Sequence, residues 1–266
     1  MVSCDLVGGQ QRFPLQPGNA AHPCGTAATR SFDFLVAMPT PRISSLITCF
    51  KDDTKLNAKD FIRACAEAPA LAMEVDVATG NTPLHFACCN GAPLPVLEAL
   101  LTANPGAASV KDNDGNYPIT GAVANGGSKD VVTALLKAFP DGIKHMDGGQ
   151  HTLLHQAACN GQSVETIAIL LAAWPQAASM RDVDGNTPLH FAAGCQASLD
   201  VTQKLLAACP EAATWRGQMN RFPLSLALLC EAPPACVAAL RDAYPEAQRT
   251  QEITADYLSH GQGVSR

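Results

Sequence analysis

The chain has 266 residues, of which 47% are hydrophobic, so it is long and apolar enough to bury a sizeable core. Its formal net charge is −6. The first 50 residues hold three basic and two acidic residues, so of the 18 basic and 24 acidic residues in total, 15 and 22 fall in residues 51–266. This acidic balance argues against a nucleic-acid-binding protein, which needs a basic stripe, and it favours basic partners.

Residues 1–50 show no sustained periodicity and contain five prolines, a composition that predicts a flexible leader. Within it, Phe32–Val36 could form a short strand or dock on the body. Asp5 and nearby glycines stand where a signal peptide needs an apolar block, so we expect a cytoplasmic or nuclear protein. The longest apolar run, Ile167–Trp174, is far shorter than the roughly 20 residues of a membrane span. Eleven cysteines in such a chain predict reduced, buried thiols.

The next segment, residues 51–75, is predicted to be an N-terminal helical cap. A helix is expected to begin near Asn57 and to end before Pro69, with Phe61, Ile62 and Cys65 on one face. Such a helix would cover the first unit of the domain that follows, because the end of a stacked array exposes apolar surface unless it is capped.

From residue 76 onward the sequence repeats every 35 residues. One marker is Thr82–His85, with the sequence Thr-Pro-Leu-His. It returns in register at Tyr117–Thr120, Thr152–His155, Thr187–His190 and Phe222–Ser225, with a truncated sixth copy at Tyr257–His260. Prolines at positions 105, 140, 175, 210 and 245 keep the same spacing, and leucine pairs precede four of them. Two independent markers in one register indicate a tandem repeat protein.

Each unit has the same predicted plan. A turn, which contains glycine in most units, leads into a short apolar helix that Thr187 would cap and that Pro188 would begin in the fourth unit. A second turn, a second helix with apolar residues at helical spacing, the proline and an Ala-rich extended segment follow. One such helix pair cannot bury its apolar face alone, so the units are expected to stack.

The order of turn, Thr-Pro-Leu-His-x-Ala, helix, turn and helix with a leucine pair resembles the ankyrin repeat. The resemblance covers residues 76–260 and implies an all-α solenoid, with an ankyrin repeat domain at 76–266 of about five full repeats and a truncated sixth. Tyr117 and Phe222 replace the capping threonine, and Thr120 and Ser225 replace the histidine. We therefore expect altered capping in the second and fifth repeats.

A metal or thiol site is the first alternative. His85, His155 and His190 recur at one helix position, so they form a ladder that cannot converge on one zinc ion, whose ligands lie about 2 Å away. The resemblance implies instead that they are neutral hydrogen-bonding residues. The cysteines are expected to act as small hydrophobic residues, with Cys195 and Cys230 as the neighbours of interest for a thiol function.

Catalysis is the second alternative. Ser225 or Cys159 could be paired with His155 on paper, but no Gly-x-Ser-x-Gly sequence is present. Gly126–Lys129 only approaches a phosphate-binding loop. We expect no enzyme activity and no catalytic, cofactor-binding or metal-binding residues.

The resemblance implies a partner-binding groove lined by the turn tips and the first helices. The partner is expected to be a protein or peptide segment, favoured if basic, and neither nucleic acid nor membrane; the chain itself is expected to be monomeric. The predicted partner-binding residues are Thr79, Asn81, Asn113, Asp114, Asn116, Tyr117, His151, Val183, Asp184, Asn186, Gln218, Met219 and Arg221. Of these, Tyr117 and Arg221 are the predicted anchors, because aromatic and arginine side chains dominate binding energies.

The favoured function is therefore a non-catalytic interaction scaffold or adaptor. Two alternatives stay open: a Cys/His thiol or metal-binding module, and a fragment of a larger ankyrin protein whose catalytic domain is absent.

Overall fold

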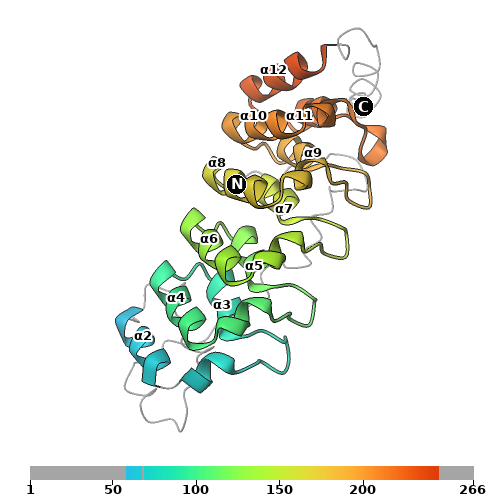
Figure 1. The fold of residues 1–266 in the computed structure, drawn as a ribbon. Coiled ribbons are helices and arrows are strands. Elements are labelled where there is room, and N and C mark those ends of the chain that lie inside the picture. Colours follow the sequence, from blue (N-terminus) through green and yellow to red (C-terminus); the bar gives the residue numbers. More distant parts are fainter. Residues whose placement is uncertain (1–57, 68, 246–266) are drawn as a thin grey trace, which may run out of the picture.

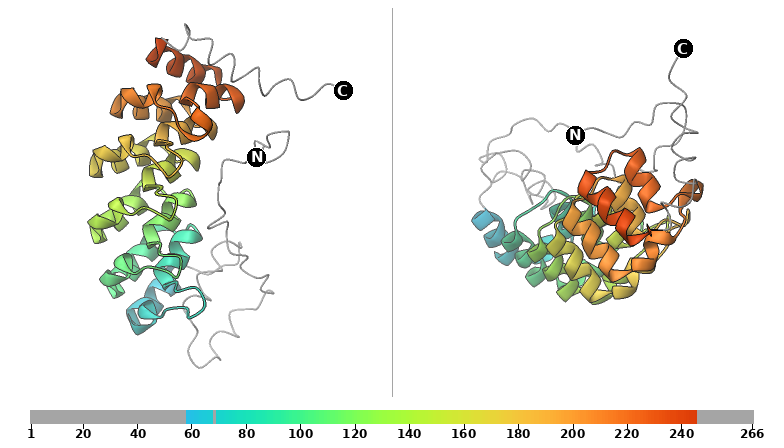
Figure 2. Two further views of the ribbon diagram at one scale, coloured as in Figure 1. Left: turned by 90° about the vertical axis from the view of Figure 1, so that its right-hand side faces the viewer. Right: turned by 90° about the horizontal axis from the view of Figure 1, so that it is seen from above.

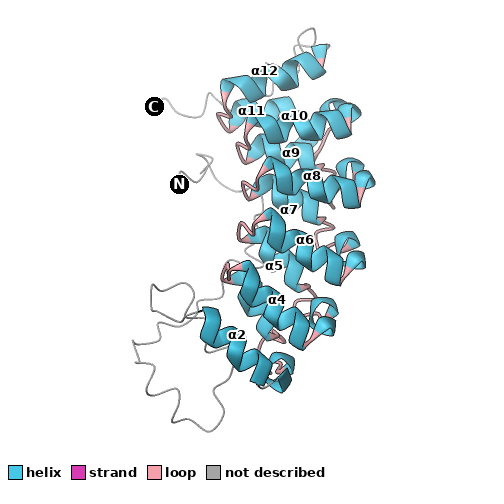
Figure 3. Ribbon diagram, turned by 60° about the vertical axis from the view of Figure 1, so that its left-hand side comes forward, coloured by secondary structure: helices cyan, strands magenta, loops and turns pink. Residues whose placement is uncertain are grey.

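The computed structural model describes residues 58–67 and 69–245, and over these residues the chain is a curved stack of helix pairs (Figure 1, Figure 2). The described part contains no β-strand (Figure 3), only an isolated bridge between Met146 and Thr152. The all-α solenoid is thereby confirmed. The predicted leader at 1–50 and the truncated sixth copy lie outside the described residues.

Five pairs of a short inner helix and a longer outer helix follow one another, and we number these pairs units 1 to 5. The inner helices are α3 (Pro83–Cys89), α5 (Pro118–Ala124), α7 (Leu153–Cys159), α9 (Pro188–Gly194) and α11 (Pro223–Leu229). The outer helices are α4 (Leu94–Ala103), α6 (Lys129–Ala138), α8 (Val164–Ala173), α10 (Leu199–Ala208) and α12 (Pro234–Ala243). One more outer helix, α2 (Ala58–Glu67), precedes unit 1.

Stacking joins like with like. Each inner helix packs on the inner helix of the next unit, each outer helix packs on the next outer helix, and α2 packs on α4. Figure 1 shows the outer helices forming one side of the stack, from α2 in blue to α12 in red. The buried core therefore runs between the two layers along the whole array, as expected for units that cannot bury an apolar face alone.

The inner helices begin with a reciprocal contact between a threonine and a histidine. In α3, Thr82 Oγ1 accepts a hydrogen bond from the His85 backbone N–H at 3.4 Å, while His85 Nδ1 accepts from the Thr82 N–H at 3.1 Å. Pro83 occupies the first helical position, where its missing N–H costs nothing. The same ring contact recurs at the starts of α7 and α9.

Units 2 and 5 lack this contact, as the sequence predicts. No side chain caps α5 or α11, which Tyr117 and Phe222 precede. The hydroxyls of Thr120 and Ser225, which replace the histidine, are buried without a hydrogen-bond partner. A buried hydroxyl without a partner costs free energy, so these two units are held less firmly at the helix start.

Serine caps begin three outer helices, α6, α8 and α10, and these three and α4 carry leucine pairs. The hydroxyls of Ser128, Ser163 and Ser198 accept hydrogen bonds from backbone N–H groups three residues later, at 3.2 to 3.4 Å. Leu135 is 1% exposed, whereas Leu136 is half-buried. The first leucine of each pair belongs to the core, and the second is half-buried in units 1, 2 and 4, whereas Leu171 in unit 3 is buried as well.

The segment after the repeating proline of units 1 to 4 differs from the prediction. It was expected to be extended, but it forms a short 3₁₀-helix, as does the segment after Pro69 that precedes unit 1. These are η3 (Pro69–Met73), η4 (Pro105–Ser109), η5 (Pro140–Lys144), η6 (Pro175–Ser179) and η7 (Pro210–Thr214). The fixed φ of proline suits the first helical position, and a three-residue hydrogen bond such as Ala107 N–H to the Asn104 carbonyl closes the turn.

Candidate functional site

The turns before the inner helices form a row of projections along one side of the stack (Figure 1). We call residues 78–81, 113–116, 148–151, 183–186 and 218–221 the tips of units 1 to 5. Each tip is closed by a hydrogen bond from a residue just before it to its last residue, for example from the Asp112 N–H to the Asn116 carbonyl at 2.9 Å. In unit 5 the tip includes the short 3₁₀-helix η8 (Gln218–Asn220), in which Met219 has a φ of 54°.

Aspartates hold the tips of units 2 to 4. Oδ1 of Asp112, Asp147 and Asp182 each accepts two backbone N–H groups of its own tip, at 2.7 to 3.0 Å. These three residues were not among the predicted site residues, although their 35-residue spacing signals a shared role. Because they satisfy the tip backbone, each tip has one shape before any partner arrives.

Neighbouring tips are also hydrogen-bonded to one another. The Asn113 N–H donates to the Thr79 carbonyl at 3.0 Å, and its side-chain amide donates to the Ala78 carbonyl at 3.0 Å. Further along, the Val183 N–H donates to the Gly149 carbonyl at 3.1 Å. These bonds join tip 1 to tip 2, and tip 3 to tip 4.

Two of the recurring histidines tie one unit to the next. His85 Nε2 lies 3.2 Å from the Asn116 carbonyl, and His155 Nε2 lies 3.1 Å from the Asn186 carbonyl. Since Nδ1 accepts from a backbone N–H, Nε2 must carry the proton and donate to that carbonyl. Burial lowers the pKa of His155 to about 4, so the ring is neutral. This is the structural role that the resemblance implies.

His190 occupies the equivalent place in unit 4 with a poorer contact. Burial lowers its pKa to about 4, against the opposing influence of the Arg221 and Trp215 carbonyls beside the ring. The geometry is too poor for a hydrogen bond, because Nε2 has no partner within bonding geometry. The junction of units 4 and 5 therefore lacks the histidine bond found between units 3 and 4.

His151 is a charged link between the tip regions of units 3 and 4. Its Nδ1 lies 3.0 Å from Asp147 Oδ2 and its Nε2 lies 3.5 Å from Asp182 Oδ2. Hydrogen bonds to Asp147 and then to Asp182 raise the pKa of His151 to about 9, so it is protonated at neutral pH. The ring also packs edge-on against Phe191, with centroids 5.3 Å apart.

The predicted partner-binding residues differ in how far the fold buries them. Asn116, Asn186 and Arg221 are buried, so they serve the fold first. Tyr117, one predicted anchor, is half-buried against the Phe139 ring at 4.9 Å between centroids. Four more residues are half-buried: Thr79, Asn81, His151 and Gln218. The exposed residues are Asn113, Asp114, Val183, Asp184 and Met219.

Two exposed apolar side chains stand out among the tips. Val183 is 61% exposed and Met219, on the next tip, is 49% exposed. Between these tips, the Gln218 side chain donates to Asp184 Oδ2 at 3.3 Å. The sequence-based prediction placed both apolar residues in the site but chose Tyr117 and Arg221 as anchors. Residue type alone does not show which side chains are buried in the folded protein.

The cysteines require a correction. Reduced thiols were expected, with Cys195 and Cys230 as the neighbours of interest, but Cys195 forms a disulfide with Cys159. Cys159 ends α7 and Cys195 caps the C-terminus of α9, which brings their Cα atoms to 5.1 Å. The exact 35-residue register misled the prediction, since the side chains that meet are 36 residues apart.

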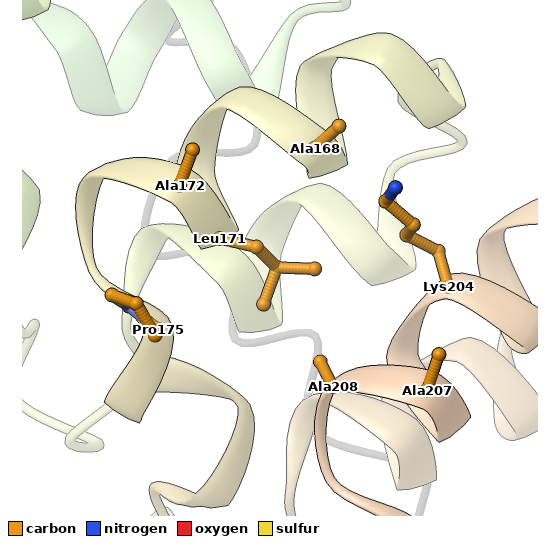
Figure 4. A pocket seen from close by; sticks show the side chains of 7 residues that line it. All are labelled: Ala168, Leu171, Ala172, Pro175, Lys204, Ala207 and Ala208. Carbon is orange, nitrogen blue, oxygen red and sulfur yellow. The ribbon is translucent and has the colours of Figure 1, made fainter.

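A shallow groove lies on the outer face, between α8 and α10 (Figure 4). Its volume is about 390 Å³, and alanines form most of its wall around Leu171, with Lys204 at one side. A ligand site needs several convergent polar groups to fix orientation, and one ammonium is the sole charged side chain here. We therefore place the candidate site on the tips.

The part of the chain that the structure describes contains neither a cluster of metal ligands nor a membrane-spanning helix. No group of three or more His, Cys, Asp or Glu side chains there could hold a metal ion. None of the helices in that part has the length and apolar character needed to cross a membrane.

Replacing Gly217 by alanine is expected to destabilise the junction of units 4 and 5 by about 1–3 kcal/mol, the usual cost of overpacking. A Cβ at this position would overlap Asn186 Oδ1 and lie 2.9 Å from the His190 ring. Gly148→Ala is the matched control, because a Cβ there meets nothing within 4 Å. Thermal unfolding measures both variants, and an equal loss of Tm in the two would contradict this reasoning.

The chain is similar in sequence and in fold to known repeat proteins. A family profile described as "Ankyrin repeat" matches residues 79–113, and another described as "Ankyrin repeats (3 copies)" matches residues 121–215. No curated protein matches the chain. Among solved structures, 372 chains match, so the fold alone does not select a function.

One matching structure is titled "Bd0816 Predatory Endopeptidase from Bdellovibrio bacteriovorus in complex with immunity protein Bd3460". The match has a TM-score of 0.59 and 20% sequence identity, and covers 76% of this chain and 98% of the other. At that identity the similarity concerns the fold only. The family profiles and the repeated helix pairs show that the chain belongs, over residues 79–113 and 121–215, to the ankyrin repeat family, whose arrays are generally protein–protein interaction modules.

Proposed function

We propose that this protein is a non-catalytic scaffold that binds a segment of another protein across the tips of units 2 to 5. The observation that carries the proposal is the exposure of Val183 and Met219 on adjacent tips. A turn that only needs to be soluble gains nothing from a valine or a methionine. Apolar side chains that remain in water on a preformed surface favour a partner, because their burial on binding stabilises a complex.

Charge supplies the second part of the proposal. Asp114 and Asp184 are exposed on tips two units apart, and they would attract basic groups of the partner. The exposed cation Arg181 is already engaged, since its guanidinium lies 5.1 Å from the Trp215 ring and donates to the Arg216 carbonyl at 3.1 Å. We therefore favour a partner segment with an apolar side chain flanked by basic ones.

The test begins by identifying partners through proximity labelling and then measures the affinity of the purified pair. The double variant Val183→Ser with Met219→Ser is expected to bind at least about tenfold more weakly, the effect of losing a central apolar contact. Val77→Ser is the matched control, because Val77 is 95% exposed but lies outside the tips. Tm should stay unchanged in both cases.

Charge reversal gives an independent measurement. Asp114→Lys with Asp184→Lys is expected to weaken capture of the same partner and to reduce its salt dependence, without lowering Tm. Unchanged affinity in both double variants would remove the tips as the docking surface.

A further inference from the structure

The disulfide between Cys159 and Cys195 is placed where it can control the surface that the inner helices form. It joins the C-terminal end of α7 to the C-terminal end of α9, in neighbouring units. The opposite ends of these helices are already joined, by His155 Nε2 to the Asn186 carbonyl at 3.1 Å. Units 3 and 4 are thus fastened at both ends of their inner helices.

The same pair of positions recurs at each junction. The last residue of one inner helix and the C-cap of the next are Cys89 and Asn125, then Ala124 and Asn160, then Cys159 and Cys195, and finally Gly194 and Cys230. Only at the junction of units 3 and 4 are both residues cysteine. The bond is therefore a local addition to a geometry that the repeat supplies everywhere.

Access distinguishes this pair from most other cysteines of the described chain. Both Cys159 and Cys195 are half-buried, so the two residues keep some contact with solvent. Cys65 and Cys88 are buried, and burial raises the pKa of Cys65 to about 11 and that of Cys88 well above its ordinary value. Those two thiols are poor nucleophiles, since the thiolate is the reactive form.

We propose that Cys159 and Cys195 form a reversible redox site that reacts with glutathione-class thiols and disulfides. On oxidation the two thiols lose two protons and two electrons as their S–S bond forms, and one molecule of oxidised glutathione takes them up to become two thiols. Reduction is the reverse exchange, through a mixed disulfide. Reversible bonds of this kind are the usual form of disulfide in reducing compartments.

The consequence concerns the freedom of α7 and α9 to move relative to one another. In the oxidised form α7 and α9 are fixed at both ends. In the reduced form the covalent link between their C-terminal ends is lost, while the packing of α7 on α9 and the His155 bond at their N-terminal ends remain, so the C-terminal ends can separate more easily. Backbone hydrogen exchange at the ends of α7 and α9 should then rise by about tenfold or more on reduction, as local opening becomes easier.

The experiment uses the full chain equilibrated with different ratios of reduced to oxidised glutathione, then alkylated and digested with trypsin. Cleavage after Lys144, Arg181 and Lys204 yields peptides 145–181 and 182–204, which contain Cys159 and Cys195 as their only cysteines. We expect the cross-linked peptide pair to disappear as reduced glutathione increases and to return on oxidation, with the helical circular dichroism unchanged. Cys159→Ser should abolish the pair, and Cys89→Ser should leave it intact.

Three results would overturn the proposal: no cross-link under oxidised glutathione, a cross-link that excess reduced glutathione never opens in the folded protein, or loss of helical structure on reduction. None of these measurements involves a partner, so failure of the docking proposal leaves the redox result interpretable, and the converse holds as well. Asn125→Cys tests the geometry separately. This variant should form a cross-link between peptide 112–129 and the peptide with Cys89 under oxidising conditions. If no such cross-link forms, the claim that the junction itself brings thiols together is wrong.

Discussion

Lowering the pH from 7 to 4 is expected to destabilise the array by about 3 kcal/mol for each of His155 and His190. Both rings are fully buried, and burial lowers the pKa of each from 6.5 to about 4. Between pH 6.5 and pH 4 these histidines are protonated in the unfolded chain but remain mostly neutral in the folded chain. The contribution of the neutral rings is complete above pH 6.5 and is lost as the pH falls through 4.

His151 acts in the opposite direction and over a different range. Its pKa is raised to about 9 by Asp147 and Asp182, so its charged form stabilises the fold fully below pH 6.5. That contribution disappears as the pH rises through 9, so the protonation of His151 does not cause the loss of stability on acidification.

Urea unfolding followed between pH 4 and pH 8 measures the acid effect. His155→Thr is the matched variant, because Thr120 already occupies the equivalent buried position in unit 2 and does not titrate. It should lower stability at pH 7 but reduce the dependence on pH. If the variant and the original chain lose stability in parallel on acidification, His155 is not the titrating group.

Leu135→Ala is expected to cost about 3–5 kcal/mol, the range found for removing a leucine from a core that cannot collapse around the gap. Leu135 is 1% exposed, and α6, which carries it, packs on α4 on one side and α8 on the other. The cavity therefore weakens two junctions at once.

Leu136→Ala provides the control within the same helix. Leu136 is half-buried, so its loss should cost clearly less than that of its neighbour. Urea unfolding midpoints of the two variants check the prediction. Similar shifts would mean that the two leucines share the core equally.

The repeat and its stacking were predictable because two markers keep one period, and period is a property that sequence displays directly. The capping threonine predicted at Thr187 has equivalents at Thr82 and Thr152, whose hydroxyls accept the expected backbone hydrogen bond, whereas the Thr187 hydroxyl lies 2.9 Å from His190 Nδ1. The departures at Tyr117 and Phe222 followed from known helix-start chemistry. The short 3₁₀-helices after the prolines were not predicted, because an Ala-rich segment fits an extended chain and a 3₁₀ turn about equally well.

The site was harder to predict for a physical reason. Whether a tip residue is available depends on contacts with the next unit, as for Arg221, which is 9% exposed, and Asn186, which is 2% exposed. Those contacts join residues more than 30 positions apart, for example Asn186 Oδ1 with the Gln218 N–H at 2.9 Å. The disulfide escaped for the same reason, since its partners lie one position off the repeat period.

The uneven fastening of the units has a mechanical consequence. A force that pulls the two ends of the array apart must pass through every junction in turn, because the main contacts join neighbouring units. The junction between units 3 and 4 carries a covalent bond, a histidine bond at His155 and the His151–Asp182 pair. Under tension the units at the two ends of the array would unfold first. Units 3 and 4, with the Val183 tip, would stay folded until a reducing agent broke the disulfide.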